Sequence, residues 1–164
     1  QHLLLFTNLG NAIYRPIHEL TDTKWKDIGE HLSQTLTNFE QEEEILFAEI
    51  VDQFEGLDSY GAKVNGKLTV SENVADLGGV ACALEAAKRD KDFSVREFFV
   101  NFATIWRMKA REEYMQMLAS VDVHAPAKWR TNVIVSNFDE FHKEFDVKEG
   151  DGMWRAPENR VIIW

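Results

Sequence analysis

Two acidic residues, Glu72 and Asp76, lie four positions apart near the start of a segment that we predict to be helical. Residues with this spacing share one face of a helix. Their carboxylates repel each other unless a cation or a hydrogen-bond donor lies between or beside them. A metal ligand and a carboxylate that supports a second ligand are arranged in this way. The pair therefore requires a fold that brings such a group to this face.

The composition limits both the size and the partners of the fold. The 164 residues suffice for one domain, and 45% of them are hydrophobic, which is enough for one core. The formal net charge of −10 argues against binding to a phosphate backbone or to an anionic membrane surface. The longest apolar runs, of about six residues, are far too short to span a membrane. We therefore expect a single domain without nucleic-acid or membrane partners.

The chain contains one cysteine, Cys82, so no internal disulfide is available. Cysteine-poor chains without disulfides are typical of reducing compartments, so we predict a cytoplasmic location. Because Cys82 follows several small residues in the predicted helix (Gly78, Gly79 and Ala81), we expect this helix to pack closely and the thiol to be buried.

Hydrophobic residues recur at spacings of three and four over much of the chain, which indicates a mainly α fold. The predicted helices span 23–55 (either one helix or two with a break near residue 40), 71–88, 94–119 and a short segment that opens at 136–139. The predicted loops span 57–68 and 121–132, and at most a short strand or two is expected near 1–15, 132–136 and 160–164.

Three details of these elements can be checked. Gly56 is predicted to end the first helical region, and Ser94 with Glu97 forms a capping-box pattern at the start of another. The apolar C-terminus is expected to dock onto the protein. The stripe predicted to be buried on helix 94–119 comprises Phe98, Phe102, Ile105, Trp106 and Met108.

The surroundings of the acidic pair resemble one family of enzymes. The helix carries the string Gly66-x-Leu68-Thr69-x-x-Glu72-Asn73-x-Ala75-Asp76-x-Gly78-Gly79. This string is similar to the third-ligand helix of zinc endopeptidases related to neprilysin and endothelin-converting enzyme. In that family the glutamate of Glu-Asn-x-x-Asp binds zinc, and the aspartate orients a zinc-binding histidine.

The resemblance continues through about residues 50–164. Asn101-Phe-Ala-x-x-Trp106 is similar to the Asn-Phe-Ala-x-x-Trp helix of the family, and Asp122-x-His124-Ala-Pro with Arg130 is similar to its substrate-binding loop. The segment from Asn137 and the terminal Trp164 match the closing pattern. Secreted members of the family carry several disulfides, and this chain, with none available, is similar to the bacterial branch instead. The fold implied by the resemblance is the C-terminal helical subdomain of a zincin-like peptidase.

The resemblance implies a role for each of four residues. Glu72 would be a zinc ligand, and Asp76 would support a zinc-binding histidine. His124 would donate to the oxyanion of the tetrahedral intermediate, because donors aimed at developing charge lower the barrier. Arg130 would hold a backbone carbonyl of the substrate through its guanidinium group.

The family's His-Glu-x-x-His motif, which supplies two zinc ligands and the general base, is absent from the sequence. His18 begins a similar string, but Asp22 stands where the second histidine is required, so His18 is a weak metal candidate. The string Asn11–Pro16 resembles the family's substrate-binding edge strand. Residues 1–45 are otherwise atypical, whereas 46–164 form the peptidase-like core.

Two functional hypotheses follow from this combination. The chain is either the C-terminal portion of a neprilysin-type zinc endopeptidase or a non-catalytic helical protein derived from that family. In the first case zinc belongs to the complete enzyme, and this chain alone is expected to bind none and to be inactive. Its partners would be a fragment that supplies the missing zinc-binding helix, a peptide substrate once complemented, or a second copy of the chain.

Overall fold

The computed structural model describes Glu30 and residues 43–163. The chain divides into two compact units, residues 1–42 and residues 43–164. The strand expected near 1–15, the ligand candidate His18 and most of the first predicted helix lie outside the described residues. The helical state of residues 43–54, which belong to that predicted helix, is confirmed.

The described part of the second unit is mainly helical, as the sequence predicted. After the helical residues 43–54 come the following elements in chain order: β1 (Asp58–Ser59), β2 (Ala62–Lys63), α3 (Gly66–Ala87), α4 (Val95–Ile105), α5 (Glu112–Val121), α6 (Ala127–Val135), α7 (Asp139–Glu144) and the 3-10 turn η2 (Pro157–Asn159).

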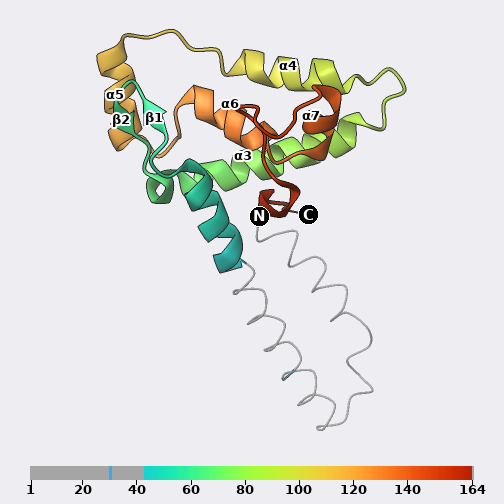
Figure 1. Cartoon of the computed structure of the whole chain (residues 1–164), viewed down its shortest axis with the longest axis horizontal. Helices are drawn as coiled ribbons and strands as arrows, with labels where there is room; N and C mark the ends of the chain where they lie inside the picture. Colours follow the sequence, from blue (N-terminus) through green and yellow to red (C-terminus); the bar gives the residue numbers. More distant parts are fainter. Residues whose placement is uncertain (1–29, 31–42, 164) are drawn as a thin grey trace, which may run out of the picture. The chain divides into compact units, whose positions relative to one another are not determined.

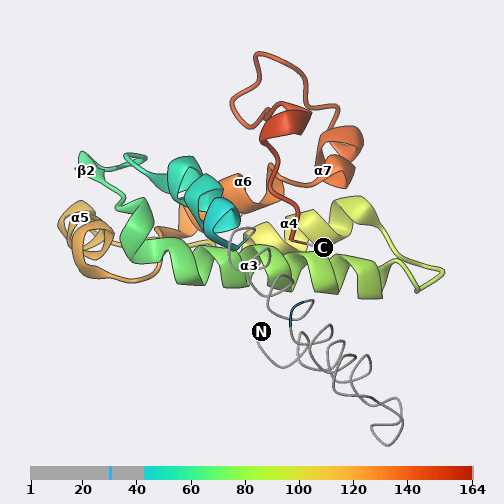
Figure 2. The same cartoon turned by 90° about the horizontal axis from the view of Figure 1, so that it is seen from below.

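The long helix α3 forms one side of this unit, and α6 lies between α3 and α4 (Figure 1). The short hairpin of β1 and β2 packs against α5 at one end, whereas α7 packs against α4 at the other end (Figures 1 and 2). This arrangement places the acidic face of α3 next to the loop that leads into α6.

The segment 57–68 was predicted to be a loop, but it contains the hairpin and the first turn of α3. The two strands pair antiparallel, with Asp58 opposite Lys63 and Ser59 opposite Ala62. Tyr60 and Gly61 both have positive φ angles, 54° and 89°, which close the tight turn between the strands. Gly56 ends the preceding helix in the left-handed region, as predicted.

Helix α3 begins before the predicted start at Ser71. Its cap is Asn65, whose side-chain oxygen accepts a hydrogen bond of 3.0 Å from the amide of Leu68. Gly66 then passes so close to the preceding helix that a Cβ atom there would lie 2.4 Å from the carbonyl oxygen of Val51. A residue without a side chain is needed at this contact.

The helix predicted over 94–119 is two helices, because residues 107–111 are not helical. Ser94 caps α4 by accepting from the amide of Glu97, as the capping-box pattern predicted. The buried residues also differ from the predicted stripe. Phe99 enters the core, whereas Ile105 and Met108 keep 74% and 51% of their surface exposed, so the predicted stripe was wrong at its C-terminal end.

Residues 127–135 form α6, although the sequence predicted a loop over 121–132 and a strand near 132–136. Pro126 begins this helix instead of preventing one, because a proline at the start of a helix sacrifices no intrahelical hydrogen bond. Its carbonyl accepts from the amides of Trp129 and Arg130. The short helix expected after Ser136 is present as α7.

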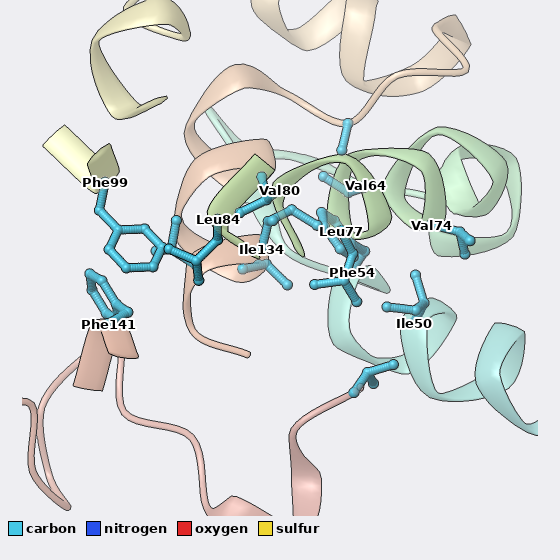
Figure 3. Packing of buried hydrophobic residues seen from close by; sticks show 14 residues of the cluster. Ile50, Phe54, Val64, Val74, Leu77, Val80, Leu84, Phe99, Ile134 and Phe141 are labelled. Carbon is cyan, nitrogen blue, oxygen red and sulfur yellow. The ribbon is translucent and has the colours of Figure 1, made fainter. Parts of the chain in front are cut away.

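The core lies where α3, α4, α6 and α7 meet the helical residues 43–54. Side chains from these elements interdigitate (Figure 3), with the Phe99 and Phe141 rings 5.6 Å apart in a T-shaped contact. The buried residues include Ile50, Phe54, Val64, Val74, Leu77, Val80, Leu84, Phe99, Ile134, Phe141 and Val161.

The C-terminal segment docks onto this core, as expected, but it forms no strand over 160–163. Val161 is buried, and its amide donates to the side-chain oxygen of Asn137 over 2.8 Å. The Asn137 amide in turn exchanges two hydrogen bonds of 2.9 Å with Gln53. This polar pair ties the C-terminal segment to the helical residues 43–54.

The exposed side of α3 contradicts one prediction. Gly78 is buried, but Gly79 has open space around it and Cys82 is exposed. The predicted burial of the Cys82 thiol was therefore wrong, because this face of the helix turns away from the core. In the part of the chain that is described, no helix is long and apolar enough to cross a membrane.

Candidate functional site

Glu72 and Asp76 lie one turn apart on α3, and each faces a group from the segment around the start of α6. Buried Ala125 and Pro126 fix this segment against the core. It presents His124 to Glu72 and Arg130 to Asp76. The structure thus brings together the four residues that the sequence singled out as site residues.

Asp76 and Arg130 form a two-point ion pair. The Arg130 Nε and Nη2 atoms donate to the two carboxylate oxygens over 2.6 and 2.7 Å. Only 14% of the Asp76 side chain and 13% of the Arg130 side chain are exposed. The guanidinium group also lies 3.9 Å from the centre of the Trp106 ring, in a cation–π contact. The arginine is thereby held through one edge and one face of its guanidinium group.

Glu72, His124 and Asp122 form a chain of carboxylate, imidazole and carboxylate. The Nε2 atom of His124 lies 3.2 Å from Glu72 Oε2, and its Nδ1 atom lies 2.8 Å from Asp122 Oδ1. The His124 amide donates to the same Asp122 oxygen over 2.9 Å. These contacts with the His124 amide and ring lower the pKa of Asp122 below its ordinary value. The imidazole is therefore oriented from one side and directed toward α3 on the other.

The sequence predicted that a cation or a hydrogen-bond donor would lie beside the two carboxylates. The structure places His124 beside Glu72 and Arg130 beside Asp76. The catalytic roles implied by the resemblance stay predictions. In particular, the Nε and Nη2 donors of Arg130 are directed at Asp76, and the histidine that Asp76 would support is not among the described residues.

A catalytic zinc site takes three protein ligands and one open position. Among residues 30 and 43–163, no group of three or more histidine, cysteine, aspartate or glutamate side chains is arranged to hold a metal ion. The donors present at α3 therefore do not fit a complete zinc site. The role of Glu72 as an oxygen ligand of zinc therefore stays a prediction from the resemblance.

Two adjoining cavities of about 540 and 420 Å³ open beside these residues. The smaller one is lined by His124 and Arg130, and the larger one by Lys128 and Trp129. Trp106, Arg107, Met108, Met115, Pro126 and Ala127 line both. Arg107, Lys128 and Trp129 were not identified as site residues from the sequence. The cluster of cationic residues at 107–111 was the feature of the sequence that could have indicated Arg107.

Comparison with known proteins identifies similar chains. The family model described as Peptidase family M13 matches residues 8–161. A neutral endopeptidase from Lactococcus lactis subsp. lactis is 54% identical over 116 residues, which are 71% of this chain and 18% of that protein. The chain thus spans about a fifth of the length of this curated relative.

Solved structures agree with the family match. PepO from Lactobacillus rhamnosis HN001 is 41% identical, with a TM-score of 0.71 over 76% of this chain and 20% of that one. The zinc metalloprotease Zmp1 from Mycobacterium tuberculosis, solved with an inhibitor, is 28% identical, with a TM-score of 0.66 over 76% of this chain and 22% of that one.

A second kind of relative matches a shorter stretch. The A subunit of DNA topoisomerase 4 from Streptococcus pyogenes serotype M3 is 74% identical over 55 residues, which are 34% of this chain and 7% of that subunit. The peptidase match thus extends over about twice as much of the chain as the topoisomerase match.

Proposed function

Because the chain belongs to peptidase family M13, we propose that it is the C-terminal portion of a neutral-endopeptidase-type zinc metallopeptidase and is inactive without the rest of that enzyme. The chain spans 18% of the length of the matching endopeptidase. The proposal assigns it one zinc ligand and the substrate-contacting loop, whereas the remaining ligands and the general base come from residues that it lacks.

The observation that carries this proposal is the pairing of α3 with the start of α6. Glu72 and Asp76 come from one helix, His124 and Arg130 from a segment about 50 residues later, and all four meet at one place. The two-point ion pair with Asp76 also holds Arg130 at the smaller cavity, next to His124. We assign Glu72 the role of zinc ligand and Asp76 that of orienting a zinc-binding histidine. His124 would donate to the oxyanion of the tetrahedral intermediate, and Arg130 would hold a backbone carbonyl of the substrate.

The expected inactivity of the isolated chain follows from the same site. Zinc in such enzymes activates a water molecule, and this requires a metal held by three ligands together with a general base. The sequence has no His-Glu-x-x-His motif to supply them. We expect the chain alone to hydrolyse no peptide, with or without added zinc.

Complementation tests the proposal directly. The Lactococcus lactis neutral endopeptidase is truncated before the segment that aligns with this chain and is mixed with this chain and zinc. Cleavage of a fluorogenic peptide is expected only in the mixture. Glu72→Ala should abolish the restored activity, whereas Glu85→Ala, a change at an exposed glutamate on the same helix, should leave it unchanged.

Failure of the mixture to cleave, with both fragments folded by circular dichroism, would contradict the proposal. It would favour the alternative, a non-catalytic protein derived from the same family. One observation supports that alternative: residues 43–163 bury a continuous hydrophobic core, which a stable remnant needs. Restored activity that is insensitive to Glu72→Ala would instead remove the ligand assignment.

The topoisomerase match bears on the origin of the first compact unit. We infer that the topoisomerase-like stretch includes residues 1–42, because the second unit begins at residue 43 and the PepO structure covers 76% of the chain. The family model also matches most of this unit, since its match begins at residue 8, and truncation distinguishes the two origins. Removal of residues 1–42 is expected to leave complementation unchanged. A loss would show that the first unit belongs to the peptidase part.

Other assignments rest on the sequence alone. The cytoplasmic location is proposed from the single cysteine. A peptide substrate, a complementing fragment and self-association are proposed as partners. Size-exclusion chromatography of the complementation mixture distinguishes a heterologous complex from an assembly of identical chains.

A further inference from the structure

The connection between α4 and α5 concentrates positive charge in a chain whose formal net charge is −10. Arg107, Lys109 and Arg111 are all exposed, and this connection contains no acidic residue. In the described structure, none of the three side chains has an ion-pair partner. Their charge is therefore available to a group from outside.

Two cations lie at the larger cavity. Arg107 lines both cavities, and Lys128 lines the one of about 540 Å³. The Lys128 ammonium group lies 4.4 Å from the centre of the Trp129 ring. The Trp129 indole is itself fixed, since it donates to the Asp58 carbonyl oxygen over 2.9 Å. The hairpin thus sets the position of the ring over which Lys128 lies.

The two carboxylates that line the cavities are hydrogen-bonded to groups other than Arg107 and Lys128. Asp58, at the larger cavity, accepts from the Gly61 amide and from Lys63, and these hydrogen bonds lower its pKa. Asp122, at the smaller cavity, is occupied by His124. Both acids already have hydrogen-bond partners. Lys128 also attracts the Asp58 carboxylate and contributes to its lowered pKa, but no ion pair joins the two in the described structure. Arg107 and Lys128 therefore lie without an ion-pair partner beside an apolar lining that includes Met115 and Pro126.

We propose that the larger cavity binds an aspartate or glutamate side chain of an extended acidic peptide, held by Arg107 and Lys128. A guanidinium group binds a carboxylate through two parallel hydrogen bonds, and an ammonium group adds a mobile donor. Because the two cavities adjoin, this places the acidic residue beside His124 and Arg130. The inference rests on the proposed function and names the substrate class for that site.

Fluorescence anisotropy with the full chain tests it. Two labelled peptides are compared that differ only by glutamate or glutamine at one position. We expect the glutamate peptide to bind about five- to tenfold more tightly at low salt, with the difference shrinking as salt screens the charges. Arg107→Gln and Lys128→Gln should each reduce the affinity for the glutamate peptide toward that for the glutamine peptide.

Lys109→Gln is the matched control, because Lys109 lies in the same connection but lines neither cavity. It should change the affinity less than about twofold. Equal affinity for the two peptides, absence of binding, or an effect of Lys109→Gln as large as that of Arg107→Gln would each overturn the inference. Complementation is measured separately, so loss of charge preference and loss of the proposed peptidase role remain distinguishable.

Discussion

The ion pair between Asp76 and Arg130 should be a large contributor to the stability of the described unit. Replacing Arg130 with methionine keeps much of the aliphatic volume but leaves the Asp76 carboxylate without its two donors. Removing one partner of a buried ion pair costs about 3–5 kcal/mol. Since 13–14% of each side chain remains exposed and water can partly solvate the carboxylate, we expect a loss of about 2–4 kcal/mol.

The assay is urea unfolding of the full chain, followed by circular dichroism and tryptophan fluorescence. With a slope of about 2 kcal/mol per molar urea, this loss lowers the unfolding midpoint by about 1–2 M. Asp76→Ala combined with Arg130→Met should be less destabilising than the sum of the single changes. We expect a coupling energy of about 1.5–3 kcal/mol, as for residues in direct contact.

An exposed pair provides the control. Lys63 and Asp58 lie 3.3 Å apart with 64% and 57% of their side chains exposed. Lys63→Met should therefore lower the unfolding midpoint far less than Arg130→Met does, because solvent screens an exposed pair. If Arg130→Met proves no more destabilising than Lys63→Met, or if the double variant shows additive losses, the pair does not hold α3 against α6 and this reasoning is refuted.

Three further predictions concern single residues. Gly66→Ala should destabilise the fold by about 1–3 kcal/mol, because its Cβ would overlap a backbone carbonyl. Gly79→Ala, which places a Cβ in open space, should be neutral or stabilising by up to about 1 kcal/mol. Urea midpoints measure both changes, and equal effects would contradict the close approach of Gly66 to the preceding helix. The lowered pKa of Asp122 means that its contribution is fully present above its unfolded pKa and is lost as pH falls through the lower folded value. Asp122→Asn should therefore reduce stability at about pH 7 but have little effect near pH 2, and a difference from wild type that does not change with pH would exclude the contact with His124 as its source. Cys82 should react with a thiol reagent in the native protein as fast as a free thiol, since it is exposed, and protection until urea is added would contradict its placement.

Much of the fold could be predicted where the signal is local. The Ser94 cap needs only a residue three positions away, and Gly56 ends a helix through its own backbone conformation. The break after Ile105 and the start of α6 at Pro126 could not be predicted in this way. The apolar spacing continues past Ile105, so the local pattern gives no sign of the break. Pro126 is compatible both with a loop and with the first turn of a helix, so its presence alone does not decide between them.

In the candidate site, too, only the residues with a local signal could be predicted from the residue pattern itself. Glu72 and Asp76 could be singled out because four residues separate them on one helix. His124 and Arg130 were found through the resemblance, and their contacts with α3 became evident only from the structure. Arg107 and Lys128 were not anticipated, because the cavity that they line exists only after α4 and α6 have packed together.

The central claim is that this chain carries one part of a zinc site and not a whole one. Zinc titration of the purified full chain, beside Glu72→Ala, tests it most directly. We predict no stoichiometric binding and no difference between the two proteins. One zinc ion per chain, bound tightly by the wild type and lost in Glu72→Ala, would show that the chain supplies further ligands of its own and would contradict the claim.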